Sequence, residues 1–194
     1  MEVKTITCYS LSLTSQDALA HLRILGPCQQ AGIKVIDGMQ HEQVVHSRVS
    51  DGDIVVVQRD FPKKFDDYQK IVEIAKRERK PIVFDLDDLL FFLPENHPNR
   101  YSQYYTSSLL PMFQAITEAT LITVSTPKLR DMLSDFNENV VVLPNFLDDT
   151  LWHLKSPISK NSRKDVLTIG YMGGETHRPD LDFITPVLLN LAKH

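Results

Sequence analysis

The chain has 194 residues, a length that allows one domain or one domain with part of another. Apolar residues make up 42% of it and charged residues 24%, so the chain can bury a core and is not intrinsically disordered. The net charge is −4, and no long run of like charges occurs. A nucleic-acid partner is therefore not expected.

Two cysteines, Cys8 and Cys28, are present, and no cluster of Cys and His has the spacing of a zinc site. This usage predicts neither a disulfide scaffold nor a structural metal, and it favours a reducing, cytoplasmic environment. The longest apolar runs are shorter than the ~18 residues of a membrane-spanning helix. Membrane contact is therefore expected to be peripheral at most.

Short β-rich runs alternate with amphipathic helical stretches along most of the chain, a pattern typical of a parallel sheet covered by helices on both faces. The sequence therefore predicts an α/β fold. The strands are expected at residues 3–8, 33–36, 53–58, 82–84, 121–124 and 140–143. The helices are expected from residue 18 onwards, at 66–79, and around 109–116 and 127–136.

Residues 66–79 show the helical pattern most clearly. Tyr68, Ile71, Val72 and Ala75 recur at helical spacing, with acidic residues at the start and basic residues at the end of the segment. Elsewhere, Gly26-Pro27 is expected to break or restart the first helix.

The character of the sequence changes after Pro144. Residues 156–164 are polar, contain little to bury, and predict a linker between domains. The apolar residues around Trp152, in contrast, predict that residues 145–154 dock on the N-terminal domain.

Beyond the predicted linker, the pattern indicates a strand at 166–171 and a helix at 181–191. One strand and one helix cannot form a core of their own. We therefore expect an N-terminal domain over residues 1–155 and the opening strand and helix of a truncated second α/β domain over 165–194.

Ligands of parallel α/β sheets bind at the carboxyl ends of strands, and Asp85, Asp87 and Asp88 directly follow the predicted strand 82–84. Three carboxylates within four residues repel one another unless they cap a helix, meet a cation or bind hydroxyl groups. The position favours a ligand-facing role over a solvent-exposed loop and helix cap. Arg23 is interpreted either as a surface residue or as a partner for an anion or for these carboxylates.

Other motifs carry less information. Gly173-Gly174 separates a predicted strand from a predicted helix, where backbone N–H groups can bind a phosphate. His97 lies in a Pro-rich segment and is expected to be a solvated loop residue rather than a catalytic base. Neither GxGxxG after the first strand nor GxxxxGK[ST] occurs, which disfavours a dinucleotide dehydrogenase or a P-loop enzyme.

Residues 82–87, Ile-Val-Phe-Asp-Leu-Asp, resemble the opening motif of haloacid dehalogenase-type phosphatases. In that family the first Asp is the nucleophile and the second is the acid/base over Mg²⁺. Further residues in a suitable order are Ser125, Lys128 and Asp148-Asp149. The match departs from the family because three predicted strands precede the motif, and because Leu89 stands where the family has Thr.

Three other segments, in order, resemble the glycosyltransferases of family 4 type, which have the two-domain GT-B fold. Residues 121–129 resemble the start of the last helix of the N-terminal domain, and residues 140–148, with the sequence Val-Val-Val-Leu-Pro-Asn-Phe-Leu-Asp, resemble the crossing into the second domain. Residues 169–174 resemble the first strand and glycine turn of the donor-binding domain. The resemblance implies a Rossmann-like, acceptor-side N-terminal domain.

The resemblance also implies site residues and substrates. The acceptor-side cleft would hold Asp85, Asp87, Asp88 and Arg23. The donor diphosphate would bind near Gly173, Gly174 and Arg178. The substrates would be a nucleotide-sugar and a carbohydrate or lipid-linked acceptor, with no cofactor and no metal.

The chain departs from this family as well. Its Glu-x7-Glu segment and most of the donor pocket are expected beyond His194, so the chain alone is expected to be inactive. Residues 9–12 also replace the usual glycine-rich loop after the first strand. A non-catalytic binding domain with the same fold is therefore a second alternative to transferase activity, beside the phosphatase.

Overall fold

The computed structural model describes residues 2–14, 17–95, 97–145, 147–149, 153, 169–171 and 173–192. The chain divides into two compact units, one of residues 1–92 with 105–152 and one of residues 93–104 with 153–194. The predicted linker at 156–164 and the predicted docking of Trp152 fall outside the described residues.

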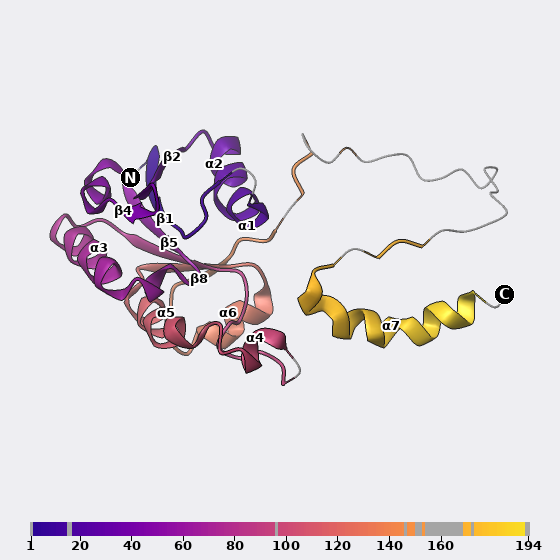
Figure 1. Cartoon of the computed structure of the whole chain (residues 1–194). Helices are drawn as coiled ribbons and strands as arrows, with labels where there is room; N and C mark the ends of the chain where they lie inside the picture. The colour runs from indigo at the N-terminus through magenta and orange to yellow at the C-terminus, as the bar shows by residue number, and fades with distance from the viewer. Residues whose placement is uncertain are drawn as a thin grey trace. The chain divides into compact units, whose positions relative to one another are not determined.

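The first unit contains a six-stranded sheet in the order β2-β1-β5-β6-β7-β8 (Figure 1). Every neighbouring pair of these strands is parallel. The strands are β1 (Thr5–Tyr9), β2 (Lys34–Asp37), β5 (Ile54–Gln58), β6 (Ile82–Leu86), β7 (Leu121–Val124) and β8 (Val140–Val142). The predicted α/β fold is confirmed, and each predicted strand of this unit has a counterpart in the sheet.

The helical segment after β1 has three parts: α1 (Ala18–Ala20), a π-helical turn η1 (His21–Leu25) and α2 (Gly26–Gln30). The N–H of Gly26 bonds to the carbonyl of His21, which closes the wide turn. Pro27 then lies at the start of α2, where its missing N–H costs little. Gly26-Pro27 therefore restarts the helix, as one of the two sequence interpretations predicts.

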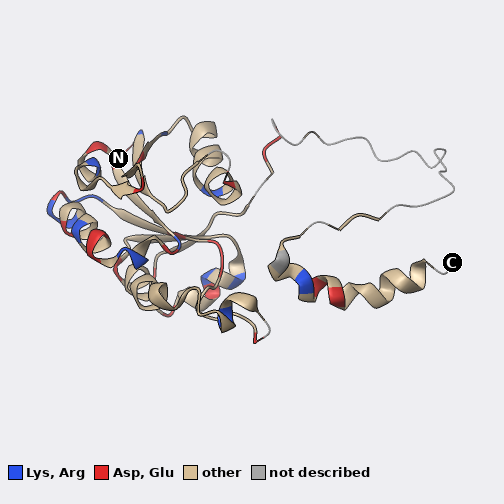
Figure 2. Ribbon diagram, viewed as in Figure 1, with Lys and Arg blue, Asp and Glu red and all other residues tan. Residues whose placement is uncertain are grey.

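Three longer helices connect the later strands, namely α3 (Phe65–Arg77), α5 (Thr106–Glu118) and α6 (Pro127–Leu133). Tyr68, Ile71, Val72 and Ala75 are all buried on α3, as their spacing predicts. The first turn of α3 is acidic and its last turn basic, which suits the helix dipole (Figure 2). The side chain of Thr126 caps α6 by accepting a bond from the N–H of Leu129 at 3.2 Å.

The sheet is buried on both faces. Val55 and Val57 belong to the larger core cluster, which the residues of α3, α5 and α6 complete. Val56, between them, belongs to a second cluster with Cys8 and with Ile24 of η1. Successive residues of a strand point to opposite faces, so the unbroken run of valines is what a covered parallel strand requires.

A small hairpin was not predicted. It consists of β3 (Met39–Gln40) and β4 (Gln43–Val44), and the 3-10 helix η2 (His46–Asp51) follows it. The turn residues His41 and Glu42 have φ values of 49° and 65°, a conformation for which Gly or Asn is the usual signal. The sequence lacks that signal, and two-residue strands are too short to show alternation.

One expectation about local structure needs correction. Strand β6 extends to Leu86, beyond the predicted end at residue 84, so that Asp85 lies inside the strand rather than after it. Two aromatic residues of the helical segments are also exposed, since Phe113 of α5 is 42% exposed and Phe136, just after α6, is 47% exposed.

The second unit contains α4 (Pro98–Tyr101), the 3-10 helix η4 (Glu175–His177) and α7 (Arg178–Leu191). His97 caps α4, since its Nδ1 accepts a bond from the N–H of Asn99 at 3.2 Å. The predicted helix at 181–191 is present but begins at Arg178. Of the predicted strand at 166–171, residues 169–171 are described and are not in a strand.

Candidate functional site

Polar side chains gather where β1, β5, β6 and β7 end, a region that we call the carboxyl edge. It comprises Ser10, Gln58, Arg59, Asp85, Asp87, Thr123 and Ser125. In doubly wound sheets, ligands bind at the carboxyl ends of the strands where the strand order reverses. Here β1 lies between β2 and β5, so the reversal falls at this edge.

Asp85 is the centre of a buried hydrogen-bond network. Nη2 of Arg23 lies 2.6 Å from its Oδ1, and Nε of Arg23 donates to both carboxylate oxygens at 3.2 and 3.3 Å. Thr123 Oγ1 donates to Oδ1 at 2.7 Å, and Gln58 Nε2 donates to Oδ2 at 3.2 Å. The side chains of Arg23 and Asp85 are 0% and 1% exposed. Because both charges are removed from water, the pair depends on these additional donors.

The same arginine also contacts the chain that leaves the sheet after β8. Its Nη1 donates to the backbone carbonyl of Leu143 and to Oδ1 of Asn145, the latter at 3.1 Å. Arg23 therefore joins η1, β6 and the segment after β8. Its interpretation as a surface residue is wrong, and its predicted pairing with the acidic cluster is confirmed.

Hydrogen bonds within the protein occupy the carboxylate of Asp85. Its two oxygens accept bonds from Arg23, Gln58 and Thr123, and Ser10 Oγ extends the network by donating to Gln58 Oε1 at 2.9 Å. A ligand hydroxyl would have to displace one of these buried donors. We therefore assign Asp85 to the support of the edge rather than to direct ligand contact.

Asp87 and Arg59 form a second, more accessible pair. Nε of Arg59 lies 3.6 Å from Oδ1 of Asp87, and the two side chains are 21% and 12% exposed. Both of these atoms are buried, and neither has a hydrogen-bond partner in the protein. Nη2 of Arg59 donates to the hydroxyl of Tyr105 at 3.2 Å. Buried polar atoms without partners are rare, so this pair has unused bonding capacity.

Burial raises the pKa of Asp87 from its ordinary value of 3.8 to about 6. The Arg59 guanidinium opposes this rise, whereas the neighbouring carboxylates of Asp88 and Asp85 add to it. A carboxyl group with a pKa near neutrality, placed at the carboxyl end of a strand, is a candidate for ligand binding or proton transfer.

The backbone holds this pair in place. Arg59 directly follows β5 with φ at 46°, a left-handed conformation that is uncommon for a residue with a side chain. Such conformations cluster at functional sites. Ser125 Oγ donates to the backbone carbonyl of Asp87 at 2.7 Å, which fixes the end of β6 to the end of β7. Asp88, the third predicted carboxylate, is exposed.

Sequence reasoning did not identify Arg59 or Tyr105. A signal for Arg59 was available, because it comes directly after the buried strand 54–58, where the rule for parallel sheets places ligand contacts. Tyr105 had no such signal, since it precedes α5 and reaches Arg59 from a position 46 residues away in the sequence.

The predicted donor residues lie in the second unit. Gly173 and Gly174 are exposed, and the N–H of His177 bonds to the carbonyl of Gly174 at 3.0 Å. Arg178 begins α7, and its Nε donates to Oδ1 of Asp182 at 3.0 Å. The two glycines therefore precede a helix, while the binding of a phosphate there stays a prediction.

In the described part of the chain, no group of three or more His, Cys, Asp or Glu side chains is arranged to hold a metal ion. Nor does any helix in that part combine the length and the apolar character needed to cross a bilayer.

The strand order and the site define a Rossmann-like, doubly wound α/β unit with polar groups at its carboxyl edge. Comparison with known proteins adds no closer assignment: no protein-family model matches the chain, and no curated protein matches its sequence.

Proposed function

We propose that the chain supplies the acceptor-side domain, and the start of the donor-side domain, of a glycosyltransferase that uses a nucleotide-sugar. The single observation that carries this proposal is the Asp87–Arg59 pair, whose facing atoms lie 3.6 Å apart without hydrogen bonds. Further support comes from the doubly wound sheet and from the three sequence segments that resemble family 4 glycosyltransferases.

A sugar hydroxyl suits this pair because it donates one hydrogen bond and accepts others at the same oxygen. It would donate to Oδ1 of Asp87 and accept from Nε of Arg59. Hydrogen bonds to charged groups contribute about 1.5–3 kcal/mol, so one such hydroxyl gives useful affinity and a defined orientation. The acceptor would be a carbohydrate or a lipid-linked sugar.

In the transfer reaction, the acceptor oxygen forms a bond to the anomeric carbon of the donor sugar. The bond from that carbon to the diphosphate oxygen breaks, and the nucleoside diphosphate leaves with the electron pair. The proton of the acceptor hydroxyl passes to the carboxylate of Asp87, whose pKa of about 6 suits a general base near neutral pH. In the donor domain, Gly173, Gly174 and Arg178 would lie near the leaving diphosphate.

The phosphatase alternative receives less support. It needs Asp85 as a free nucleophile, but that carboxylate is 1% exposed and accepts bonds from Arg23, Gln58 and Thr123. A non-catalytic binding domain would use the same Asp87–Arg59 pair, and only an activity measurement separates it from a transferase. Since both cysteines are free thiols, we infer a reducing compartment such as the cytoplasm.

The test is binding of the chain to an array of monosaccharides, oligosaccharides and lipid-linked sugars. We expect a subset of these acceptors to bind, and Asp87→Asn to weaken the binding about tenfold by removing a charge-assisted hydrogen bond. Asp135→Asn, at an exposed acid on the same unit, is the matched control and should bind as the unmodified chain does.

Activity is then measured on the intact native protein, with radiolabelled UDP- and GDP-sugars and the acceptors found on the array. Transfer that Asp87→Asn slows would establish the proposal, whereas binding without transfer would favour the non-catalytic domain. Mg²⁺-dependent hydrolysis of p-nitrophenyl phosphate, abolished by Asp85→Asn, would instead favour the phosphatase.

A further inference from the structure

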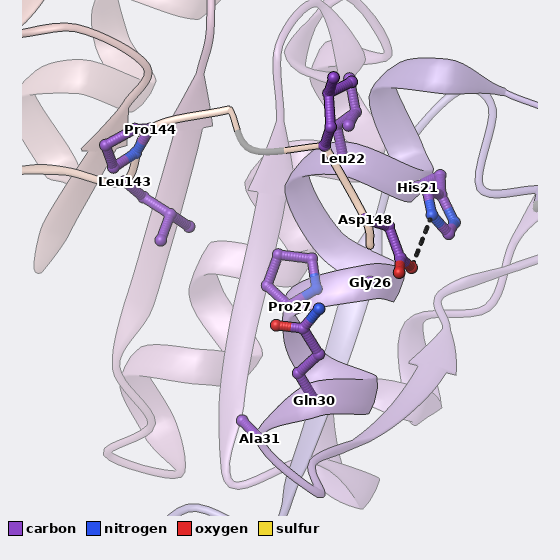
Figure 3. Close-up of a pocket in the computed structure, with 10 residues that line it drawn as sticks. His21, Leu22, Gly26, Pro27, Gln30, Ala31, Leu143, Pro144 and Asp148 are labelled. Atoms are coloured by element: carbon purple, nitrogen blue, oxygen red, sulfur yellow. Dashed lines mark ion pairs between the residues drawn. The ribbon is translucent and has the colours of Figure 1, made fainter. Parts of the chain in front are cut away.

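A cavity of about 390 Å³, whose lining does not include Asp87 or Arg59, lies between the first helical segment and the chain that follows β8 (Figure 3). Residues of η1 and α2 contribute to one wall, and the other wall contains Leu143, Pro144, Leu147 and Asp148. The volume falls within the range of about 300–1,000 Å³ that small-molecule sites occupy. Nothing in the proposed transfer reaction uses this cavity.

Most of the lining is apolar. Leu22 and Pro27 contribute from the helical side, while Leu143, Pro144 and Leu147 contribute from the other side. The wall after β8 is held in place, because Nη1 of Arg23 donates to the carbonyl of Leu143. The cavity is therefore suited to a compact apolar body, and one of its walls is fixed before any ligand binds.

The polar groups of the cavity include His21 and Asp148. Nε2 of His21 lies 3.5 Å from Oδ2 of Asp148, which is longer than a hydrogen bond between these atoms (Figure 3). Nε2 is buried and has no hydrogen-bond partner in the protein. A buried imidazole nitrogen without a partner, beside a carboxylate in an apolar cavity, calls for a group that can bond to both.

A hydroxyl oxygen meets this requirement. A hydroxyl oxygen bonded to both groups would donate to the carboxylate of Asp148 and accept from the imidazole of His21. An ether oxygen can accept but not donate, and a hydrocarbon can do neither. The pair therefore distinguishes alcohols from apolar molecules of the same shape.

We propose that this cavity is a binding site for a small neutral alcohol with a compact apolar body, such as a ring. The site is independent of the glycosyltransferase proposal, since none of its lining residues belongs to the Asp87–Arg59 pair. Its apolar walls bury the body of the ligand, and the His21–Asp148 pair selects its hydroxyl group.

The experiment is a titration of the isotope-labelled chain with benzyl alcohol, followed by backbone amide shifts in NMR spectra. We expect saturable shifts centred on Gly26 and Leu147, with a dissociation constant of about millimolar. Benzyl methyl ether, which lacks the donor, should bind at least about fivefold more weakly. Equal binding of the two compounds, or no shifts at these residues, would overturn the proposal.

Two variants and their controls locate the site. Asp148→Ala should weaken the binding of benzyl alcohol about tenfold, and Asp135→Ala should leave its dissociation constant unchanged. Ala31→Leu narrows the cavity from an exposed position and should abolish the shifts, whereas Ala18→Leu, outside the lining, should not. Shifts that instead centre on the apolar groove at Phe113 and Phe136 would show non-specific partitioning and would also refute the proposal.

Discussion

The guanidinium of Arg23 forms a buried ion pair with the carboxylate of Asp85, although the two residues are 62 positions apart in the sequence. The contact joins the helical segment after β1 to the middle of the sheet. It also places the chain after β8, through Leu143 and Asn145, against the same helical segment. The carboxyl edge and the cavity beside it therefore share one support.

Removing one partner of this pair should be costly. Arg23→Met leaves the Asp85 charge buried without its main counter-charge, and we expect a loss of about 3–5 kcal/mol in the free energy of unfolding. The double variant Arg23→Met/Asp85→Leu should recover much of that loss, because no unpaired charge remains. Urea unfolding of both variants provides the measurement.

Arg130→Met is the control for this prediction. Arg130 pairs with Asp131 at 2.8 Å on the surface, where both side chains are about half exposed or more. Exposed pairs contribute little, so the change should be within about 0.5 kcal/mol. A loss at Arg23 no larger than this would show that the buried pair does not support the fold.

The pH dependence of stability should identify Asp87. Its pKa of about 6 in the folded protein exceeds its ordinary value of 3.8, so between these pH values the folded state holds a proton that the unfolded state has lost. The folded state therefore loses stability as the pH rises through this window, and the destabilisation by Asp87 reaches its full size above pH 6. It is absent below pH 3.8, where both states are protonated.

Asp87→Asn removes this titration. From about pH 4 to pH 7, the stability of the variant relative to the unmodified chain should rise by on the order of 2 kcal/mol. Urea unfolding at several pH values measures the difference, and Asp135→Asn should show a constant difference. If the Asp87→Asn curve runs parallel to that of the unmodified chain, the raised pKa is wrong.

Much of the fold was predictable because the burial of a strand or of a helix face determines the spacing of apolar residues in the sequence. The valines at 55–57 are each buried, two in one core cluster and one in the other, and an unbroken β-branched run is the corresponding pattern. Tyr68 and Ile71 likewise show their buried helical face through spacing alone.

The candidate site was less predictable because its partners meet only in three dimensions. Asp85 is a buried charged residue inside β6, whereas the sequence pattern predicts that the strand ends before it. Its main partner, Arg23, lies on a helical segment far away in the sequence. Arg59 has a left-handed backbone conformation at the end of β5. An arginine in the sequence does not predict that conformation. Local propensity contains no information on such pairings.

The two cysteines should react very differently with a thiol reagent. Cys8 is fully buried in the sheet, and burial, with a smaller contribution from the charge of Asp85, raises the pKa of its thiol well above 9.0. Cys28 is half-buried, and burial raises the pKa of its thiol as well. We expect Cys28 to react first and Cys8 on the order of a hundredfold more slowly, through opening of the sheet.

Single-cysteine variants, Cys28→Ser and Cys8→Ser, separate the two reactions with Ellman's reagent. Adding Arg23→Met to the Cys28→Ser variant should accelerate the reaction of Cys8, because the network that closes the carboxyl edge is then broken. Similar rates for the two cysteines in the folded chain would mean that the sheet is not closed around Cys8.

Nucleotide-sugar binding by this chain should be weak. The guanidinium of Arg178 already pairs with Asp182 at 3.0 Å on α7, and binding a diphosphate there competes with that bond. The glycines at 173 and 174 offer backbone N–H groups but no charge of their own. By calorimetry, we expect UDP- and GDP-sugars to bind no more tightly than about millimolar, which corresponds to about −4 kcal/mol. Asp182→Asn releases Arg178 and should strengthen the binding severalfold if the diphosphate contacts that residue, whereas Asp131→Asn should not. Micromolar binding by the unmodified chain would show that a donor site exists outside the residues proposed for it.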